Sequence, residues 1–344
     1  MAHGSKQKRF KMTKKQVLAL SAIVIATAAA LLLIRFWENQ HWSVGEEDTR
    51  YDYGNGSKEV MFRGSWYTER EDLETILVAG VDKYADQIVG QDTLVNYQQA
   101  DFLVLLVLDE ERQICKAIQI NRDTMADVNY FDSQGNVAGH SYEQIALSHS
   151  YGTGGEDSNR NMVETVSNLL YGIRIDHYVV FTMDAVAKIN DAVGGVPVEI
   201  RDDFSGVNDD WKIGDTVLLK GADALKYVRA RGGMAEPTNL ARMERQRQYL
   251  SAWRDTFFSK AEENEKLLYE TFGSAAQYLS SDCSLEKLKY LFDSSADLPF
   301  ELVTPNGTAE LGEKYIEFTP DEEELQELVV STFFEPREND GTEE

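Results

Sequence analysis

Three nearly continuous apolar segments between residues 74 and 120 constrain the fold of this chain most strongly. They are Glu74–Asp82, Phe102–Leu108 (FLVLLVL) and Ile114–Ile120. Short apolar runs bounded by turn residues are typical of strands that are buried on both faces. We therefore predict two buried strands and a hairpin partner at the start of the folded body.

Segments with helical periodicity alternate with further strands in the rest of the chain. Residues 159–170, for example, place Met162, Val166 and Leu170 at the spacing of one helix face. Strands separated by helices favour the α/β class, and we predict a three-layer α/β/α body with a central mixed sheet. The predicted helices are 159–170, 183–193, 221–228, 240–258, 260–279, 285–292 and 321–334, and the later strands are 178–182, 196–200, 300–304 and 315–318.

The segment 135–155 is rich in glycine, serine and histidine, and we predict a loop that leads into a helix. It contains His140 and His149. A zinc site needs a third ligand at suitable spacing, which this segment lacks, so we expect no metal centre on these histidines.

An uncharged apolar run of 18 residues, Val17–Ile34, is long enough to cross the hydrocarbon core of a bilayer. Basic residues before the run and acidic residues after it predict a cytoplasmic N-terminus and an extracytoplasmic body. A cleaved signal peptide is the alternative. The apolar residues continue through Leu31–Ile34, past the small residues expected at a cleavage site, so a retained anchor is favoured.

These features predict a single-pass protein of the cell membrane with five parts. Residues 37–70 are assigned as a juxtamembrane linker because their glycines and charges show no clear period. The parts are a basic cytoplasmic tail (1–16), a transmembrane helix (17–36), the linker (37–70), the folded body (71–336) and an acidic tail (337–344).

The charge balance excludes one class of partner. The chain has 59 acidic and 34 basic residues and a formal net charge of −25. Such a charge repels phosphate backbones, so we expect no binding of nucleic acid by the body. Two cysteines, Cys115 and Cys283, do not make a disulfide framework in a chain of 344 residues, and we expect both to be free.

Charged side chains lie at the ends of the three first strands. Asp82 follows the first strand, Asp101 precedes the second, and Arg122 and Asp123 follow the third. Functional groups of α/β proteins collect at such strand ends. Each carboxylate taken alone is better explained as a turn residue at the end of a strand.

A second charged feature is the arginine-rich stretch Tyr227–Gln248, which contains Arg229, Arg231, Arg242 and Arg245. Arg242 and Arg245 share a helix face, where like charges repel each other, and the planar guanidinium group suits phosphate oxygens. A pyrophosphate site is one interpretation, and a solvated surface neutralised by nearby acids is the other. The four strand-end residues favour the first.

The ordered series of short motifs resembles the LytR-CpsA-Psr family of cell-wall phosphotransferases, over roughly 73–248 and again at 305–330. The motifs follow a short basic tail and one apolar span. They are Gly80-Val81-Asp82, Ala100-Asp101, Asn121-Arg122-Asp123-Thr124, Asp176-His177-Tyr178, Val193-Gly194-Gly195-Val196, Leu219-Lys220-Gly221, Tyr227-Val228-Arg229-Ala230-Arg231 and Arg242-x-x-Arg245-Gln246.

The resemblance implies that the body, 71–336, transfers a glycopolymer from an undecaprenyl-pyrophosphate carrier onto peptidoglycan as a phosphodiester, with magnesium. The lipid would enter an apolar pocket between the sheet and the helices. Asp82 and Asp101 are then the natural Mg²⁺ ligands. Asp123 either acts as a base or orients Arg122, and we favour orientation. The expected pyrophosphate ligands are Arg122, Arg229, Arg231, Arg242, Arg245 and Gln246.

The chain departs from the family pattern at three positions. Gln99 stands where the family commonly has an arginine, Asn239 where it has an acid, and Ala241 where it has a glycine. Losing one arginine removes a charge-assisted hydrogen bond worth about 1.5–3 kcal/mol. Two alternatives therefore stay open beside transfer, namely a non-catalytic scaffold that binds polyprenyl phosphates and a polyprenyl pyrophosphatase.

Overall fold

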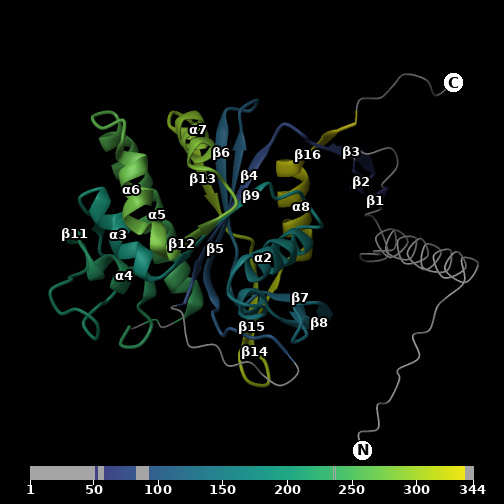
Figure 1. The fold of residues 1–344 in the computed structure, drawn as a ribbon, viewed down its shortest axis with the longest axis horizontal. Helices are drawn as coiled ribbons and strands as arrows, with labels where there is room; N and C mark the ends of the chain where they lie inside the picture. Colours follow the sequence, from purple (N-terminus) through teal and green to yellow (C-terminus); the bar gives the residue numbers. More distant parts are fainter. Residues whose placement is uncertain (1–50, 53–57, 83–92, 235, 237, 338–344) are drawn as a thin grey trace, which may run out of the picture. The chain divides into compact units, whose positions relative to one another are not determined.

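The computed structural model describes residues 51–52, 58–82, 93–234, 236 and 238–337 (Figure 1). These residues belong to two compact units, of which the larger is Arg70–Phe333. The smaller unit contains an antiparallel four-stranded sheet in the order β1-β2-β3-β16. Its strands are β1 (Tyr51–Asp52), β2 (Glu59–Phe62), β3 (Ser65–Glu69) and β16 (Phe334–Pro336).

The predicted cytoplasmic tail, the transmembrane helix (17–36) and positions 338–344 of the acidic tail lie outside the described residues. Within the described ranges, no helix has the length and apolar character that crossing a membrane requires.

The larger unit is built on a six-stranded sheet in the order β12-β9-β4-β5-β6-β13. β4 is parallel to β9 and β6 is parallel to β13, whereas the other neighbours are antiparallel. The predicted mixed α/β fold with a central mixed sheet is therefore confirmed. The strands are β4 (Glu74–Val81), β5 (Ala100–Asp109), β6 (Ile114–Gln119), β9 (His177–Thr182), β12 (Leu279–Ser281) and β13 (Phe300–Val303).

Helices cover both faces of this sheet (Figure 1). α2 and α8 lie on one face, and α3, α5, α6 and α7 lie on the other. The sheet is apolar on both sides for this reason, and Leu77, Leu103 and Leu105 are fully buried. The helices are α2 (Glu156–Leu169), α3 (Asp184–Ala192), α4 (Ala222–Arg229), α5 (Asn239–Ala261), α6 (Leu267–Ala275), α7 (Leu285–Ser295) and α8 (Glu322–Phe333).

Three two-stranded ribbons complete the unit. The ribbon β10–β11 contains the predicted strand with Pro197. The ribbons are β7 (Met125–Phe131) with β8 (Val137–Gln144), β10 (Val196–Glu199) with β11 (Thr216–Leu219), and β14 (Gly307–Leu311) with β15 (Ile316–Pro320).

The predicted loop over 135–155 is wrong in its first half. This stretch forms β8 and then a 3₁₀ helix, Ile145–Ser150. β7 shows the alternation of a half-buried strand, with Ala126 and Val128 buried and Asp127 exposed. β8 has no fully buried residue, so its sequence carries no hydrophobic period that would have revealed it.

Two helix predictions also need correction. The predicted helix 260–279 is interrupted, because α5 continues to Ala261 and α6 begins only at Leu267. Leu240, the apolar residue at the start of the predicted helix 240–258, is 49% exposed. The buried positions in the first turns of α5 are taken by Met243 and by three polar side chains, Arg242, Arg245 and Gln246. Cys115 and Cys283 are free, as expected, and both are buried.

A buried ion pair at the start of the larger unit provides a stability test. The side chain of Arg70 is 1% exposed and forms a bidentate pair with Asp109. Burial alone would raise the pKa of Asp109, but the hydrogen bonds from Arg70 hold it below its usual value. We expect Arg70→Ala to lower the free energy of unfolding by about 3–5 kcal/mol, because it leaves Asp109 buried without its partner.

The matched control is Arg160→Ala, since the Arg160–Glu156 pair is exposed and should contribute less than about 1 kcal/mol. A depressed carboxyl pKa stabilises the fold above the unfolded pKa of about 4, and that contribution is lost as the pH falls through the folded pKa. The difference between wild type and Arg70→Ala should therefore narrow from pH 7 to pH 3 in denaturant titrations. Equal losses for Arg70→Ala and Arg160→Ala would contradict this account.

Candidate functional site

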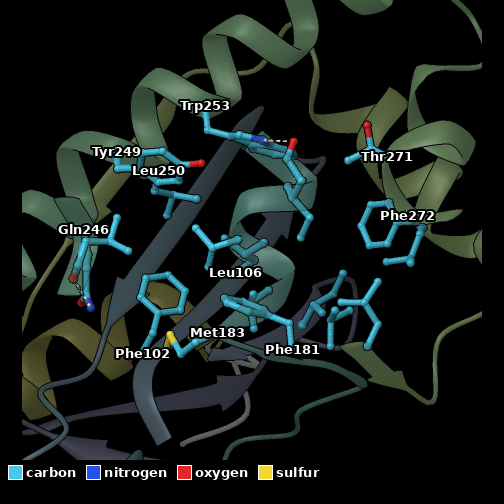
Figure 2. Close-up of a pocket in the computed structure, with 18 of the residues that line it drawn as sticks. Phe102, Leu106, Phe181, Met183, Gln246, Tyr249, Leu250, Trp253, Thr271 and Phe272 are labelled. Atoms are coloured by element: carbon cyan, nitrogen blue, oxygen red, sulfur yellow. Dashed lines mark hydrogen bonds between the residues drawn. The ribbon is translucent and has the colours of Figure 1, made fainter. Parts of the chain in front are cut away.

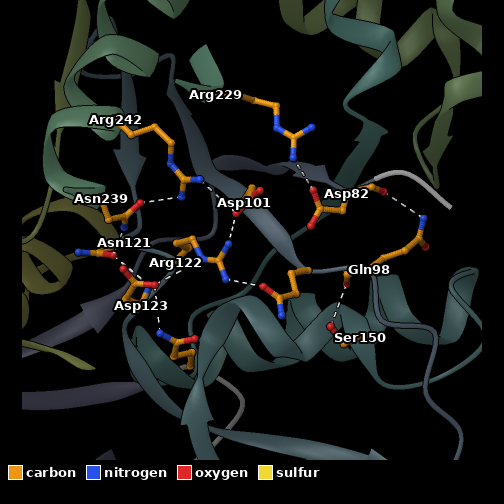
Figure 3. Close-up of polar contacts among 12 residues, drawn as sticks. Asp82, Gln98, Asp101, Asn121, Arg122, Asp123, Ser150, Arg229, Asn239 and Arg242 are labelled. Carbon is orange, nitrogen blue, oxygen red and sulfur yellow. Dashed lines mark hydrogen bonds and ion pairs between the residues drawn. The ribbon is translucent and has the colours of Figure 1, made fainter. Parts of the chain in front are cut away.

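Three strand ends meet at one edge of the central sheet. β5 runs antiparallel to both β4 and β6, so the end of β4, the start of β5 and the end of β6 lie together. This brings Asp82, Asp101 and Arg122 into one cluster, as the sequence predicted (Figure 3).

A bulge in β5 sets the direction of Asp101. Gly80 pairs with Phe102 and Val81 pairs with Ala100, which leaves Asp101 as the extra residue. Such a bulge re-aims the extra side chain and is common beside functional sites. Asp101 is buried and accepts hydrogen bonds from Arg122 and Arg242.

The turn after β6 presents the next two functional side chains. The side-chain oxygen of Asn121 accepts a hydrogen bond from the backbone N–H of Asp123 at 2.9 Å, which closes an Asx turn. Arg122 then reaches Asp101 and donates to Gln99 Oε1 at 2.6 Å. Its Nε lies 3.4 Å from Asp123 Oδ1. Arg122 is therefore held by two carboxylates and one neutral amide.

The arginine-rich stretch approaches this edge from α4 and α5. Arg229, at the end of α4, pairs with Asp82 at 3.1 Å, and Arg242, in the first turns of α5, lies 3.3 Å from Asp101. α5 begins at Asn239 because Thr238 is the N-cap, with its hydroxyl accepting from Ala241 N–H.

Asn239 instead connects two parts of the cluster. Its Oδ1 accepts from Arg242 and its Nδ2 donates to Asn121 Oδ1, both at 2.6 Å. Arginine can only donate, so Asn239 must turn its oxygen to Arg242 and its nitrogen to Asn121. Asn121 then presents the oxygen that also accepts from Asp123 N–H. One orientation of both amides satisfies the whole chain of hydrogen bonds.

The two remaining predicted arginines differ in what they contact. Arg245 donates to Asp202 at 2.7 Å and to the carbonyl of Ala230, so its guanidinium group is already engaged. The Nε atom of Arg231 is buried and lacks a hydrogen-bond partner in the part of the chain that the structure describes, as does the Nε atom of Arg245, so the two arginines differ in the bonds that the other nitrogens of Arg245 make. Arg231 nevertheless acts electrostatically on Asp101, Asp123 and Arg242. Arg245 thus holds the backbone beside Arg231, whereas Arg231 is available for a ligand.

The electrostatics of the cluster follow from burial and from these pairs. Burial and the Asp101 carboxylate raise the pKa of Asp82 against the effect of Arg229. Burial alone would raise the pKa of Asp101, but Arg122 and Arg242 hold it below its usual value. Burial raises the pKa of Asp123 despite Arg122. Burial also lowers the pKa of Arg242 to about 10, so this group stays protonated at neutral pH.

The cluster therefore has an excess of positive charge. Four guanidinium groups, those of Arg122, Arg229, Arg231 and Arg242, face three carboxylates, those of Asp82, Asp101 and Asp123. In a partly desolvated site this excess favours an anion, and fixed guanidinium donors suit phosphate oxygens.

The carboxylates of the cluster are also candidate ligands for a divalent cation. Across the described ranges, no group of three or more histidine, cysteine or acidic side chains could hold a metal ion. Asp82 and Asp101 are close enough to repel each other. Two carboxylates fit Mg²⁺, which commonly takes one or two carboxylates and completes its octahedron with water and phosphate oxygens.

An apolar cavity of about 200 Å³ lies between the central sheet and helices α3, α5, α6 and α7 (Figure 2). Its wall includes the side chains of Phe102, Val228 and Gln246, which adjoin Asp101, Arg229 and Arg245 in the sequence. Phe102 and Gln246 lie at one end, and Thr271 and Phe272 lie at the other. Gln246 faces this cavity and Gln119, with 3.3 Å between its Oε1 and Gln119 Nε2, rather than the arginines.

The cavity is partly open, so its apolar walls are not fully shielded from solvent. An apolar ligand inside it would remove those walls from water, which contributes about 25 cal/mol per Å² of apolar surface. The polar end of such a ligand would lie beside the arginines, because Phe102 and Val228 line the cavity next to Asp101 and Arg229.

Some polar partners of the site were missed from the sequence. Gln144 Nε2 donates to Asp123 Oδ1 at 3.1 Å, and Gln98 Nε2 donates to the Asp82 carbonyl at 3.2 Å. Asp202 binds Arg245. These residues carry no motif, and only the chain fold brings them to the cluster. The Asn121 and Asn239 side chains could have been suspected from their places in the motifs.

Comparisons with known proteins show which proteins the chain is similar to. The sequence model of the LytR_cpsA_psr family matches residues 39–329. The chain is 29% identical over 243 residues to the polyisoprenyl-teichoic acid–peptidoglycan teichoic acid transferase TagU of Halalkalibacterium halodurans, covering 70% of this chain and 71% of TagU. It is 27% identical to the corresponding transferase TagV of Bacillus subtilis, covering 86% of this chain and 73% of TagV. The crystal structure of B. subtilis TagV superposes with a TM-score of 0.59 at 25% identity, covering 76% and 96% of the two chains.

The contrast between Arg231 and Arg245 is testable. We expect Arg231→Ala to weaken binding of inorganic pyrophosphate about tenfold or more while the melting temperature changes little, because the lost attraction to Asp101 and Asp123 is offset by relief of the repulsion of Arg242. Arg245→Ala should lower the free energy of unfolding by about 1–3 kcal/mol, because it loses its bonds to Asp202 and Ala230. Titration calorimetry and thermal unfolding measure the two effects. The assignment fails if Arg231→Ala destabilises as much as Arg245→Ala and binds pyrophosphate normally.

The hydrogen bonds that the neutral Asn239 amide makes to Arg242 and Asn121 give a second test. Asn239→Asp places a third carboxylate beside Arg242 and opposes its oxygen to that of Asn121. We expect pyrophosphate affinity to fall about tenfold by calorimetry, since the excess positive charge is cancelled. Stability should change by less than about 1 kcal/mol, because an acid suits the first turn of a helix. Asn239→Ala, which removes the bridge without adding charge, should weaken binding less than Asn239→Asp. An Asn239→Asp variant as tight as wild type would refute the charge argument.

Proposed function

The chain belongs to the LytR_cpsA_psr family, and on that premise we propose that it transfers a glycopolymer from an undecaprenyl-pyrophosphate carrier onto peptidoglycan. It is then a phosphotransferase of the glycopolymer–peptidoglycan ligase type. The TagU and TagV relatives, which are named as teichoic acid transferases to peptidoglycan, support this class of reaction.

One observation carries the proposal, namely that an apolar cavity adjoins a cluster with excess positive charge. Phe102 lines the cavity directly after Asp101, and Val228 lines it directly before Arg229. A polyprenyl pyrophosphate has matching parts, an apolar tail and a doubly phosphorylated head. Each methylene that the tail buries contributes about 0.8 kcal/mol. The head carries negative charge, which balances the excess positive charge of the four guanidinium groups.

The reaction follows from this placement. The oxygen of an acceptor hydroxyl on the glycan attacks the phosphorus that carries the polymer and forms a new P–O bond. The bond from that phosphorus to the bridging oxygen breaks, and polyprenyl phosphate leaves with the electron pair. Arg122, Arg229, Arg231 and Arg242 stabilise the charge on the phosphate oxygens in the transition state.

Asp123 has a supporting part in this scheme. Its Oδ1 lies 3.4 Å from Arg122 Nε and accepts a hydrogen bond from Gln144. We assign it to the orientation of Arg122, with the hydroxyl proton passing to water. Arg245 is assigned to the positioning of Arg231 through the Ala230 carbonyl, and Gln246 to the wall of the cavity.

Asp82 and Asp101 would hold Mg²⁺ together with oxygens of the pyrophosphate. When bound there, the ion would neutralise charge on the phosphates and fix their orientation. Burial and the Asp101 carboxylate raise the pKa of Asp82, and a cation bound between the two carboxylates would oppose both effects.

The proposed setting is the outer side of the cell membrane, with the N-terminus in the cytoplasm. The apolar run Val17–Ile34 supports a single-pass anchor. Such an anchor would keep the domain near the lipid carrier and the wall.

A reconstituted transfer assay tests the proposal. Full-length chain in detergent micelles, incubated with lipid-linked polymer and peptidoglycan, should yield a covalent conjugate that depends on Mg²⁺. We expect Arg122→Ala and Arg229→Ala to lower the rate by about 10²–10³-fold, because each removes a donor to the reacting phosphates. Arg247→Ala is the matched control, since Arg247 lies on α5 and pairs with Glu244 instead of the cluster.

Full transfer by both Arg122→Ala and Arg229→Ala would sink the mechanism. Phosphate release without an acceptor would favour the pyrophosphatase, and tight lipid binding without turnover would favour the scaffold.

A further inference from the structure

A strip of side chains leads away from Asp123 along the outer face of the β7–β8 ribbon. Ala126 and Val128 are buried, so the alternate residues of β7 face outward. Their partners in the register are Gln144 opposite Met125, Tyr142 opposite Asp127 and His140 opposite Asn129. We call these six residues the β7–β8 strip.

The strip begins at the site itself. Gln144 Nε2 donates to Asp123 Oδ1 and also to the backbone carbonyl of Ile316 in β15, at 2.7 Å. Tyr142 lies two residues before Gln144, so its side chain is on the same face and about 7 Å further from Asp123. Tyr142 is 64% exposed. A ligand that lies along the strip therefore has one end beside Asp123 and Arg122.

The β14–β15 ribbon runs beside the strip. Thr124 bridges to Phe318, and Phe318 N–H donates to the Asp123 carbonyl at 2.9 Å. Glu317 and Glu322 act electrostatically on Tyr142, together with Asp127 of the strip. Tyr315 and Ile316 are exposed at the start of β15. The strip thus combines an exposed aromatic ring with amides and surrounding carboxylates.

We propose that the β7–β8 strip binds the acceptor, a glycan strand of neutral N-acetylated sugars, and directs one of its hydroxyls toward Arg122. This inference rests on the proposed function. The chemistry of the strip is the reason for this occupant. A tyrosine ring offers a rigid apolar face for the C–H face of a sugar ring, and amide and carboxylate oxygens accept hydrogen bonds from hydroxyl groups.

The negative charge around the strip argues against binding of the donor polymer there. The strip contains no lysine or arginine, and Asp127, Glu317 and Glu322 surround Tyr142. A polyanionic chain would be repelled here, whereas a neutral sugar strand is not. The lipid of the donor would instead occupy the apolar cavity.

The position of the strip separates the two substrates. β7 packs against α2, on one face of the central sheet, whereas the cavity lies against α3, α5, α6 and α7 on the other face (Figure 1). Donor and acceptor would approach from opposite faces and meet at the edge that carries Arg122 and Asp101 (Figure 3).

Binding and transfer measured on Tyr142 variants test the proposal. The probe is a soluble, uncrosslinked strand of alternating N-acetylglucosamine and N-acetylmuramic acid in which every muramic acid carboxyl is in amide linkage, so that the sugar backbone is uncharged. It is titrated into the full-length chain in detergent micelles. We expect Tyr142→Ala to weaken strand binding and to raise the acceptor KM about tenfold, with kcat and donor-lipid affinity unchanged. Tyr142→Phe, which keeps the ring, should retain strand binding. The matched control is Tyr269→Ala, which removes an exposed tyrosine from α6.

The possible outcomes distinguish failure of this proposal from failure of the proposed transferase function. Strand binding that is lost in Tyr142→Ala but present in wild type supports the strip even if no transfer occurs. Transfer by wild type with an unchanged acceptor KM in Tyr142→Ala overturns the strip and leaves the transferase intact. The strip is also overturned if wild type does not bind the strand, or if a free polyanionic glycerol-phosphate polymer competes for Tyr142.

Discussion

The candidate site depends on repulsion among guanidinium groups that the fold forces together. Arg122 and Arg242 share Asp101, and Arg231 acts electrostatically on Asp101 and Arg242 while its Nε lacks a hydrogen-bond partner in the described part of the chain. Three carboxylates hold the cluster in place but do not balance it. Burial makes the imbalance matter, because charges interact more strongly away from water, and it lowers the pKa of Arg242 to about 10. The cluster is therefore stable enough to form and still favours an additional anion.

Neutral amide side chains preserve this excess of positive charge. Gln99 accepts a hydrogen bond from Arg122, and Asn239 accepts one from Arg242. Both arginines are therefore oriented without a further carboxylate that would neutralise their positive charge. Asn121 ties this arrangement to the turn that carries Asp123. From the sequence, Gln99 and Asn239 looked like losses from a family pattern. In the structure they hold arginines in position, and this role needs an oxygen acceptor without requiring a negative charge.

The parts of the fold and site that the sequence predicted correctly are those with local signals. The apolar strands β4, β5 and β6 and their polar ends follow from continuous runs of apolar residues, and antiparallel pairing then brings Asp82, Asp101 and Arg122 together. The β8 strand was missed because neither of its faces is fully buried. The partner of Arg245 was missed because Asp202 lies 43 positions away, in a loop without a motif. Contacts of this kind depend on the tertiary fold, and no local pattern encodes them.

The two halves of the proposed ligand meet at one place in the fold. The cavity and the charged cluster share the segments Asp101–Phe102 and Val228–Arg229, so a change in either segment affects both. The central claim is that one polyprenyl pyrophosphate occupies both. A crystal structure of the chain with such a lipid tests it most directly. The account predicts phosphate oxygens within hydrogen-bond distance of Arg231 and Arg242 and an isoprenoid chain running from Phe102 toward Phe272. A lipid bound elsewhere, with side chains closing the cavity, would contradict it.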